Sequence, residues 1–393
     1  MRDGWVETNL EGIAEYINGY PFKPADLGEN GVPVIRIKQL LDPNEPVDRT
    51  ETETPERCLL RNGDIVFSWS GTLAVRIWNR GPAKLNQHLF RVVEKEGVYK
   101  GFIPLILDHA IEELEEKSHG TTMKHITKQT LLPHKVLLPS LPEQRRIVDL
   151  ISSVDSYTEA LQHQLEAAKR SRIAVLHELL TAGGDDWVNT TLGHVCDFIN
   201  GDRGKNYPSA KFRQSHGIPF INAGHLGEGI VNFDSMDFIS EEVFNRLGGG
   251  KIQPGDILFC LRGSVGKFAN VGELEKGAIA SSLVIIRPNS QITRDFLMHY
   301  LDSDLCSSEL KQSLTGAVQP NLSANNLKSF KISLPNIESQ KEIGNLLGQF
   351  KDSIASLGLL IKSTKNLRNG LISDLLSGQH QIPASYDKVI GAA

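Results

Sequence analysis

The feature that most constrains how this chain folds is an internal repeat, in which motifs of the first half return in the second half in the same order. Self-similarity of this kind is the sequence signature of a duplicated architecture. The recurring motifs are Trp5-Val6 with Trp187-Val188, Ile17-Asn18-Gly19 with Ile199-Asn200-Gly201, Gly63-Asp64-Ile65-Val66-Phe67 with Gly255-Asp256-Ile257-Leu258-Phe259, and Gly71-Thr72 with Gly263-Ser264. One shared peptide would be weak evidence, but an ordered series indicates a duplication.

The spacing between the repeats shows where the halves differ. The offset is 182 residues at the Trp-Val motif and 192 at the Gly-Asp-Ile motif. It settles at 196 from Gly120 and Gly316 onward, where Gln144 matches Gln340. Insertions therefore concentrate in the early part of each half. One half covers about residues 5–182 and the other about 187–377.

The first part of each half, which we call the head, has a mixed α/β pattern. Short apolar runs bounded by turn residues are typical of strands. We expect strands at 34–37, 65–67 and 89–93 in the first head and at 218–221, 257–259 and 283–286 in the second. Helices are expected at 103–117 and 295–314.

Each half ends in a long helical segment, which we call a rod. Leu141-Pro142-Glu143 has the proline and the acidic residue of a helix start, and neither proline nor glycine follows it before Thr181. The apolar residues show the alternating three-and-four spacing of a coiled-coil seam. They are Ile147, Leu150, Val154, Tyr157 and Leu161 in the first rod and Ile343, Leu347, Phe350, Ile354, Leu357 and Ile361 in the second.

A helix of this length with one apolar face needs a partner to cover that face. The chain supplies two such helices, so we predict an intramolecular two-helix coiled coil. The alternative is that each rod packs only on its own head. Antiparallel pairing would place the heads at opposite ends of the coil, related by a pseudo-twofold axis. Such a chain could touch two different half-sites on a DNA duplex, as dimeric DNA-binding proteins do.

Composition narrows the class of protein. The 42 basic and 47 acidic residues give a net charge of -5, which excludes a uniformly basic, histone-like binder but not local basic patches. No apolar run reaches the roughly 18 residues of a membrane span, and the first residues lack the apolar stretch of a signal peptide. The four cysteines form no CxxC pair. These features favour a cytoplasmic protein without disulfides, structural zinc or a membrane partner.

The sequence lacks the common catalytic motifs. The sequence contains no Asn-Pro-Pro-Tyr motif of adenine methyltransferases, no GxGxxG or GxxxxGK[ST] phosphate loop, and no HExxH zinc motif. Asp64 and Asp256 recur in both halves, but an aspartate between glycine and a strand is usually a turn former. We therefore expect no catalytic residue and no metal site in this chain.

Local basic stretches mark candidate DNA-binding residues, because lysine and arginine neutralise phosphates and arginine, asparagine and glutamine suit base edges. Divergent loops after the repeated Ile-Asn-Gly and Gly-Asp-Ile motifs carry most of them. The candidates are Tyr20, Lys23, Arg61, Arg76, Arg80, Lys84, Asn86 and Gln87 in the first head and Arg203, Lys205, Tyr207, Lys211, Arg213, Arg262 and Lys267 in the second.

The repeated motifs resemble the specificity subunit of type I restriction-modification enzymes. The resemblance rests on Trp-Val at the start of each half, Gly-Asp-Ile in each head, the Gly120 and Gly316 turns, and Leu-Pro followed by Gln144 or Gln340. It implies an α/β (α+β) duplicated fold: target-recognition domains at 1–140 and 187–336, and long helices at 141–182 and 337–378 that form an antiparallel coiled coil. Only the tail at 379–393 lies outside it.

The resemblance implies a non-catalytic, sequence-specific DNA-binding subunit. Each recognition domain would bind one part of a split, asymmetric target in double-stranded DNA, and the helices would dock two methyltransferase subunits. Motor-nuclease restriction subunits would join through these. S-adenosylmethionine, ATP and magnesium are expected on the partner subunits. The alternatives are a stand-alone bipartite DNA-binding regulator and a protein-interaction scaffold.

Overall fold

The computed structural model describes residues 4–117, 128–184, 186–227, 229–314 and 321–387. The chain divides into two compact units, each of which joins one head to part of both rods. Unit 1 contains residues 1–162 and 359–393, and unit 2 contains residues 163–358. Each unit is described by itself.

The head of unit 1 contains two four-stranded sheets and a strand pair. The first sheet has the order β2 (Ala14–Asn18), β9 (Leu89–Glu94), β6 (Ile65–Ser68) and β7 (Ala74–Ile77). The second has the order β4 (Arg49–Thr50), β3 (Val32–Ile35), β8 (Ala83–Leu85) and β5 (Leu59–Leu60). β1 (Val6–Asn9) pairs with β10 (Lys135–Leu138). The helices are α1 (Leu10–Ile13), α2 (Ile37–Leu41), α3 (Phe102–Lys117) and α4 (Lys128–Leu131).

The head of unit 2 repeats this plan with additional strands. Its larger sheet has the order β12 (Cys196–Asn200), β20 (Leu283–Pro288), β17 (Ile257–Cys260), β18 (Phe268–Asn270), β15 (Gly229–Val231) and β14 (Leu226–Gly227). The smaller sheet has the order β16 (Asp237–Ile239), β13 (Ile218–Ile221) and β19 (Ala278–Ile279), and β11 (Val188–Thr191) pairs with β21 (Lys331–Leu334). The helices are α6 (Leu192–Val195), α7 (Glu241–Arg246), α8 (Arg294–Leu301), α9 (Asp304–Leu314) and α10 (Ala324–Lys328).

Strand register confirms the duplication. Val6 lies opposite Leu138 in unit 1, and Val188 lies opposite Leu334 in unit 2. The repeated Gly-Asp-Ile strands also keep their partners, since Ile65 lies opposite Val92 and Ile257 lies opposite Ile286. Insertions such as the β14–β15 hairpin therefore extend a common core without changing it.

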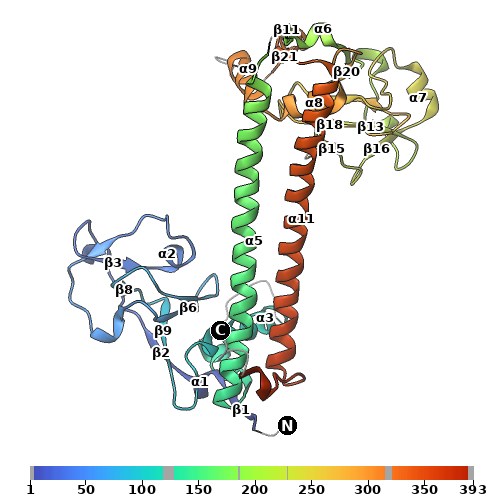
Figure 1. The fold of residues 1–393 in the computed structure, drawn as a ribbon. Helices are drawn as coiled ribbons and strands as arrows, with labels where there is room; N and C mark the ends of the chain where they lie inside the picture. The colour runs from blue at the N-terminus through green and yellow to red at the C-terminus, as the bar shows by residue number, and fades with distance from the viewer. Residues whose placement is uncertain (1–3, 118–127, 185, 228, 315–320, 388–393) are drawn as a thin grey trace. The chain divides into compact units, whose positions relative to one another are not determined.

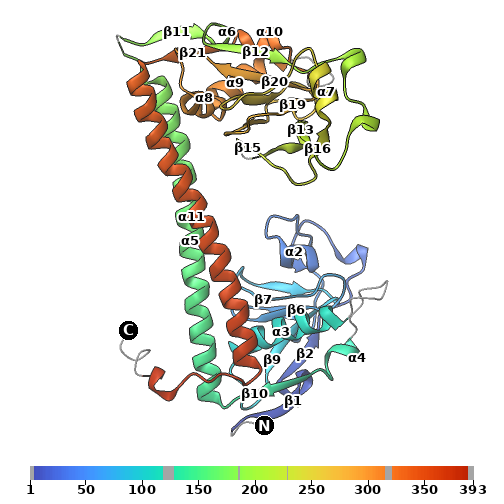
Figure 2. The same cartoon turned by 90° about the vertical axis from the view of Figure 1, so that its right-hand side faces the viewer.

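The rods are α5 (Leu141–Thr181) and α11 (Ile337–Leu376), and they pair antiparallel, as predicted. In unit 1 the start of α5 lies beside the end of α11, and in unit 2 the end of α5 lies beside the start of α11 (Figures 1 and 2). In unit 1, Ile147 and Ile372 share one core with the head. In unit 2, Leu176 and Leu347 share one core with the second head. Each rod therefore packs on the other rod and on a head.

The seam of α5 differs from the predicted one at Tyr157. Tyr157 is half exposed, and the neighbouring Thr158 is buried in its place. Leu150 packs against the core as predicted, and Ile151 beside it is buried as well. The threonine fits there because its hydroxyl donates to the Val154 carbonyl oxygen at 2.8 Å, which satisfies its one polar group.

The repeated glutamines explain the motif at the start of each rod. Gln144 is fully buried; it accepts a hydrogen bond from the Tyr99 amide at 2.7 Å and donates to the carbonyl oxygens of Pro139 and Gly97. Gln340 does the same with the Thr293 amide at 2.8 Å and the carbonyl oxygens of Pro335 and Gln291. Each glutamine thus links the head to its rod through backbone groups that would otherwise be buried without partners.

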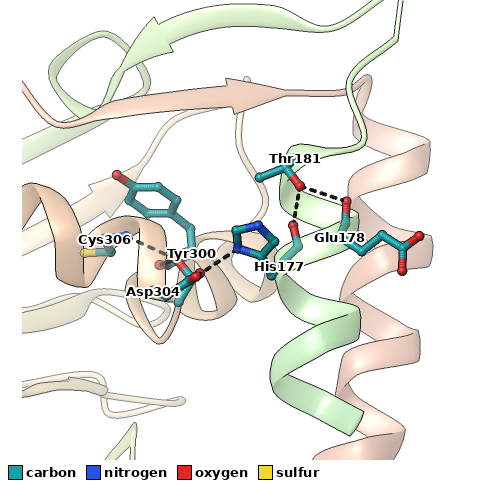
Figure 3. A network of polar contacts seen from close by, with 7 residues as sticks. His177, Glu178, Thr181, Tyr300, Asp304 and Cys306 are labelled. Carbon is teal, nitrogen blue, oxygen red and sulfur yellow. Dashed lines mark hydrogen bonds and ion pairs between the residues drawn. The ribbon is translucent and has the colours of Figure 1, made fainter. Parts of the chain in front are cut away.

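The helix predicted at 295–314 is broken into α8 and α9. The break lies at Ser303, whose buried hydroxyl donates to the Tyr300 carbonyl oxygen at 2.6 Å and accepts from the Cys306 amide at 3.2 Å. A serine that bonds the backbone in this way favours a helix start over a helix interior. The new helix brings Asp304 to α5, where its carboxylate lies 2.8 Å from Nδ1 of His177 (Figure 3).

Candidate nucleic-acid interface

Two of the predicted DNA-binding residues of the second head line one polar cavity of about 670 Å³. Arg203 follows β12 and Arg262 follows β17, so the sheet brings together residues 59 positions apart. Nε of Arg262 donates to the side-chain oxygen of Asn321 at 3.2 Å, and Asn325 lies on the same wall. Arginine and asparagine are the side chains that best match guanine and adenine edges. The cavity therefore has the chemistry of a base-contacting surface.

The carboxylate in this cavity is already occupied. Asp202 accepts hydrogen bonds from the backbone amides of Arg203 and Gly248, both at 2.7 Å. Asp202 therefore orders the loop, and these hydrogen bonds go to backbone amides rather than to the guanidinium groups of Arg203 and Arg262. Neither Asn321 nor Asn325 was predicted, because no charged residue lies between positions 312 and 327 to mark this segment.

A second group of predicted residues surrounds Phe220. Tyr207 packs edge-on against the Phe220 ring at 5.7 Å, and the Arg213 guanidinium lies over the same ring at 5.5 Å. Arg213 also pairs with Asp237 at 2.8 Å and is about two-thirds buried. These contacts give Arg213 a role in ordering the head, and only part of its surface remains open to a ligand.

Lys211 lies in a more exposed setting. Its ammonium group lies 5.0 Å from the ring centroid of Phe212, and Arg246 approaches the same ring at 5.4 Å. An exposed aromatic ring between two cations can stack on bases and contact phosphates. Phe212 and Arg246 escaped prediction, although a phenylalanine inside a basic stretch was a usable signal. The side chain of Lys205 lies outside the described residues.

In the first head, the structure joins two of the predicted segments. The Tyr20 amide donates to the Leu85 carbonyl oxygen at 2.7 Å, and the Gln87 amide donates to the Tyr20 carbonyl oxygen at 3.1 Å. Gln87 and Lys23 are exposed beside this junction. The loop after β2 and the loop after β8 therefore form one surface with aromatic, amide and ammonium groups.

The arginines of the first head are scattered. Arg61 is exposed and pairs with Glu56 at 3.0 Å, and Arg76 is exposed on β7. Arg80 stacks over Trp78 at 4.2 Å and donates to the Gln39 carbonyl oxygen. The structure therefore does not bring these three into one site.

Two of the predicted residues are corrected by their burial. Lys84 is only 7% exposed, and its ammonium group donates to the Thr52 carbonyl oxygen at 2.5 Å. Its counterpart in unit 2 is the fully buried Ala278, so Lys84 occupies a core position of the sheet. Asn86 is also 7% exposed and caps the loop through the His88 amide. Neither presents a free surface to DNA.

The repeated glycine and aspartate motifs have structural roles. A Cβ at Gly201 would lie 2.6 Å from the Ala280 carbonyl oxygen, and one at Gly19 would clash with backbone oxygens of β8 and Asn86. Asp64 accepts from the Arg61 amide at 2.8 Å and Asp256 from the Gln253 amide at 2.7 Å. The prediction that these aspartates form turns is confirmed.

One carboxyl group between the first head and the rods has a strongly perturbed environment. Asp108 is near the middle of α3, and burial raises the pKa of its carboxyl to about 6. Arg76 and Arg368 act in the opposite direction, while Glu112 and Asp155 add to the rise. The charged form of Asp108 is thus disfavoured in the folded chain.

Replacing Asp108 by asparagine is expected to stabilise unit 1 above pH 7 by about 1–2 kcal/mol. A carboxyl whose folded pKa lies above its unfolded value binds more protons in the folded state, so stability falls as pH rises from about 4 through 6. Urea unfolding at pH 4.5 and pH 8 measures the difference. A variant that gains nothing at pH 8, or gains equally at both pH values, contradicts this account.

Within the described ranges, no group of three or more histidine, cysteine or acidic side chains is placed to hold a metal ion. The four cysteines are buried free thiols, and burial raises the pKa of Cys196 to about 12. Among the residues that the structure describes, no helix has the length and apolar character that crossing a membrane requires.

Comparison with known proteins identifies relatives of the whole chain. The family described as the type I restriction modification DNA specificity domain matches twice, at residues 2–169 and 184–362. The specificity subunit of the type I restriction enzyme EcoBI of Escherichia coli is 25% identical, over 99% of this chain and 92% of its own. The MjaVIII specificity subunit of Methanocaldococcus jannaschii is 23% identical, over 97% and 94%.

Solved structures show the same fold. A chain from a study of complex assembly and conformational transition in the type I R-M system has a TM-score of 0.65 and 19% identity, covering 96% of this chain and 98% of its own. The S subunit from M. genitalium has a TM-score of 0.56 and 17% identity, covering 95% and 96%.

Proposed function

We propose, from the premise that this chain belongs to the family of type I restriction-modification DNA specificity subunits, that it binds a split, asymmetric target through its two heads. Membership makes it a non-catalytic DNA-binding component of a restriction-modification system. The observation that carries the split target is that the specificity domain matches twice, once in each half. Because the candidate surfaces differ between the heads, the two half-sites should differ in sequence.

Each head has a distinct candidate surface for this role. The second head combines Arg203, Arg262 and Asn321 in one cavity, and the first head combines Tyr20 with Gln87. Side chains that contact base edges specify sequence, whereas lysine and arginine on phosphates position the protein. Asymmetry of the target would follow from these differences.

The rods are proposed to dock two methyltransferase subunits, which would in turn carry the motor-nuclease subunits. S-adenosylmethionine, ATP and magnesium would be bound by these partners. Exposed apolar side chains on α11 support this role, because soluble surfaces seldom keep them in a cluster without a partner. Leu359 and Leu367 are 70% and 57% exposed, and Leu360 is 41% exposed two helical turns before Leu367.

Methylome sequencing tests the proposal most directly. A strain with the intact system should carry adenine methylation at one split, asymmetric motif, and deletion of this gene should remove it. Purification of the chain should recover two methyltransferase copies. An unchanged methylome after deletion favours a stand-alone regulator, and recovery of other proteins without DNA binding favours a scaffold.

The variant Leu360→Glu with Leu367→Glu should lose one of the two methyltransferase copies. The two leucines lie on the same face of α11 because they are seven residues apart, and two buried carboxylates at an interface are costly. Native mass spectrometry of the purified complex measures the stoichiometry. Asn369→Glu is the control, since it adds charge to an exposed position on the opposite side of the helix. Two copies retained by the double variant would place the docking surface elsewhere.

A further inference from the structure

A second cavity of unit 2, of about 740 Å³, lies where the rods meet the head. We call it the rod–head cleft. Lys169 and Arg172 enter it from α5, and Lys351 enters it from α11. The head contributes Lys267 and the glycine backbone of the β14–β15 hairpin. Its apolar lining comes from Ile173, Met298 and Ile354.

The charge of the cleft is strongly positive among its described lining residues. Among the described lining residues, four cations face one carboxylate, that of Asp302, which Arg172 already binds at 2.5 Å; Glu228, between Gly227 and Gly229 in the sequence, lies outside the described residues. Lys169 also pairs at the rim with Glu166, at 2.8 Å between exposed groups. Lys267 and Lys351 are exposed, and no described carboxylate lies within ion-pair distance of either. The Lys351 ammonium group points to the hairpin, 3.8 Å from where a Cβ on Gly229 would lie.

The internal repeat provides a matched comparison in unit 1. With the offset of 196 that aligns the rods, Arg172 corresponds to Arg368 and Lys169 to Lys365. The same offset places Asp155 at the position of Lys351, which reverses the charge. In unit 1, Arg368 binds this Asp155 across the two rods, at 2.5 and 3.2 Å.

The head residues at this junction also give unit 2 more positive charge than unit 1. Asp302 corresponds to Asp108, because α8 and α3 align with the offset of 194 that also matches Phe296 to Phe102. Strand register matches Lys267 to Ala74. The equivalent positions of unit 1 therefore hold two cations and two carboxylates, and Arg76, which acts on Asp108, adds a third cation there. The positions of unit 2 hold four cations and one carboxylate.

We propose that the rod–head cleft binds a phosphodiester of the DNA backbone and that unit 1 has no equivalent site. The inference rests on the proposed function and deepens it by adding a contact outside the two base-recognition surfaces. A cluster of cations beside glycine backbone suits a phosphate, and the apolar wall suits the attached sugar. Because phosphate contacts carry no sequence information, the site would set position and affinity and leave the choice of bases to the heads.

Equilibrium binding at several salt concentrations tests the site. The probes are a 40-base-pair duplex that contains the methylated motif and an unrelated duplex of equal length, with the full chain assembled with its methyltransferase subunits. Lys351→Gln should reduce the slope of log K against log salt by about 0.9 for both duplexes. Lys351→Asp, which installs the residue of unit 1, should weaken binding to both by roughly tenfold. The preference for the target should stay the same.

Lys362→Asp is the matched control, because it makes the same charge change at an exposed position of α11 outside the cleft. If both Lys351 variants match this control in slope and affinity, the proposal is overturned. The proposal is also overturned if the Lys351 variants release the methyltransferase subunits while those variant complexes that stay assembled bind DNA as tightly as the wild type. The cleft would then bind an acidic segment of a protein. If the wild-type complex shows no target preference but Lys351→Gln still lowers the slope, the phosphate site stands and the proposed function fails.

Discussion

Replacing residues 1–140 with the first head of another specificity subunit is expected to change one half of the methylated target and leave the other half intact. The segment contains both strands of the β1–β10 pair, so the exchange cuts no sheet of unit 1. Gln144 bonds the head through backbone groups at Gly97, Tyr99 and Pro139, which a foreign head with the same loops would also supply. Methylation at the original target should fall at least about a thousandfold, the usual ratio of specific to non-specific binding.

The measurement is methylome sequencing of strains that carry the exchanged chain. Exchange of residues 187–336 is the reciprocal control and should change only the other half. The new head must keep apolar residues where Ile103 and Leu107 face the rod core that contains Ile147. If both halves of the target change together in a folded chain, the heads do not act independently and the modular interpretation is wrong.

Gln340→Ala is expected to destabilise unit 2 by about 3 kcal/mol, and Gln144→Ala to do the same to unit 1. Each substitution removes three hydrogen bonds to backbone groups in a buried setting, and unsatisfied buried groups cost about 1–3 kcal/mol each. The side chains are 1% and 0% exposed, so water has no access to replace the lost partners. Urea unfolding followed by circular dichroism measures the loss.

Gln349→Ala is the matched control, because Gln349 is an exposed glutamine on the same helix. It should leave the unfolding free energy within about 0.5 kcal/mol of the wild type. A similar, small effect of all three substitutions would show that the buried glutamines do not link the heads to the rods. A loss of DNA binding at full stability would instead point to a role in ligand contact.

Local patterns predicted the rods and six of the strands, but not the short strands and helices between them. The strands at 65–67 and 257–259 and the rods appear within a few residues of their predicted ends, because each is a long or strongly apolar run bounded by turn residues. The turn role of Asp64 and Asp256 followed from a short motif whose hydrogen bonds are local. Duplication strengthened every one of these predictions, since each pattern occurs twice.

The failures have a common cause in contacts between distant segments. Lys84 appeared to belong to a basic surface stretch, but pairing of β8 with β3 and β5 places it inside. Tyr157 was assigned to the seam by spacing alone, and the face that meets α11 instead selects Thr158. The break at Ser303 depends on one buried hydroxyl, which helix periodicity does not reveal.

The sequence by itself determined the duplication, the two heads, the two rods and the family, because these depend on patterns along the chain and on their repetition. Only the tertiary structure determined which charged side chains lie close together. Arg203 joins Arg262 through sheet pairing, and Lys351 joins Lys267 and Arg172 where helices meet a hairpin. The net charge of -5 averages over such groups. Electrostatic attraction depends on distances in space, and those are fixed by packing rather than by position in the sequence.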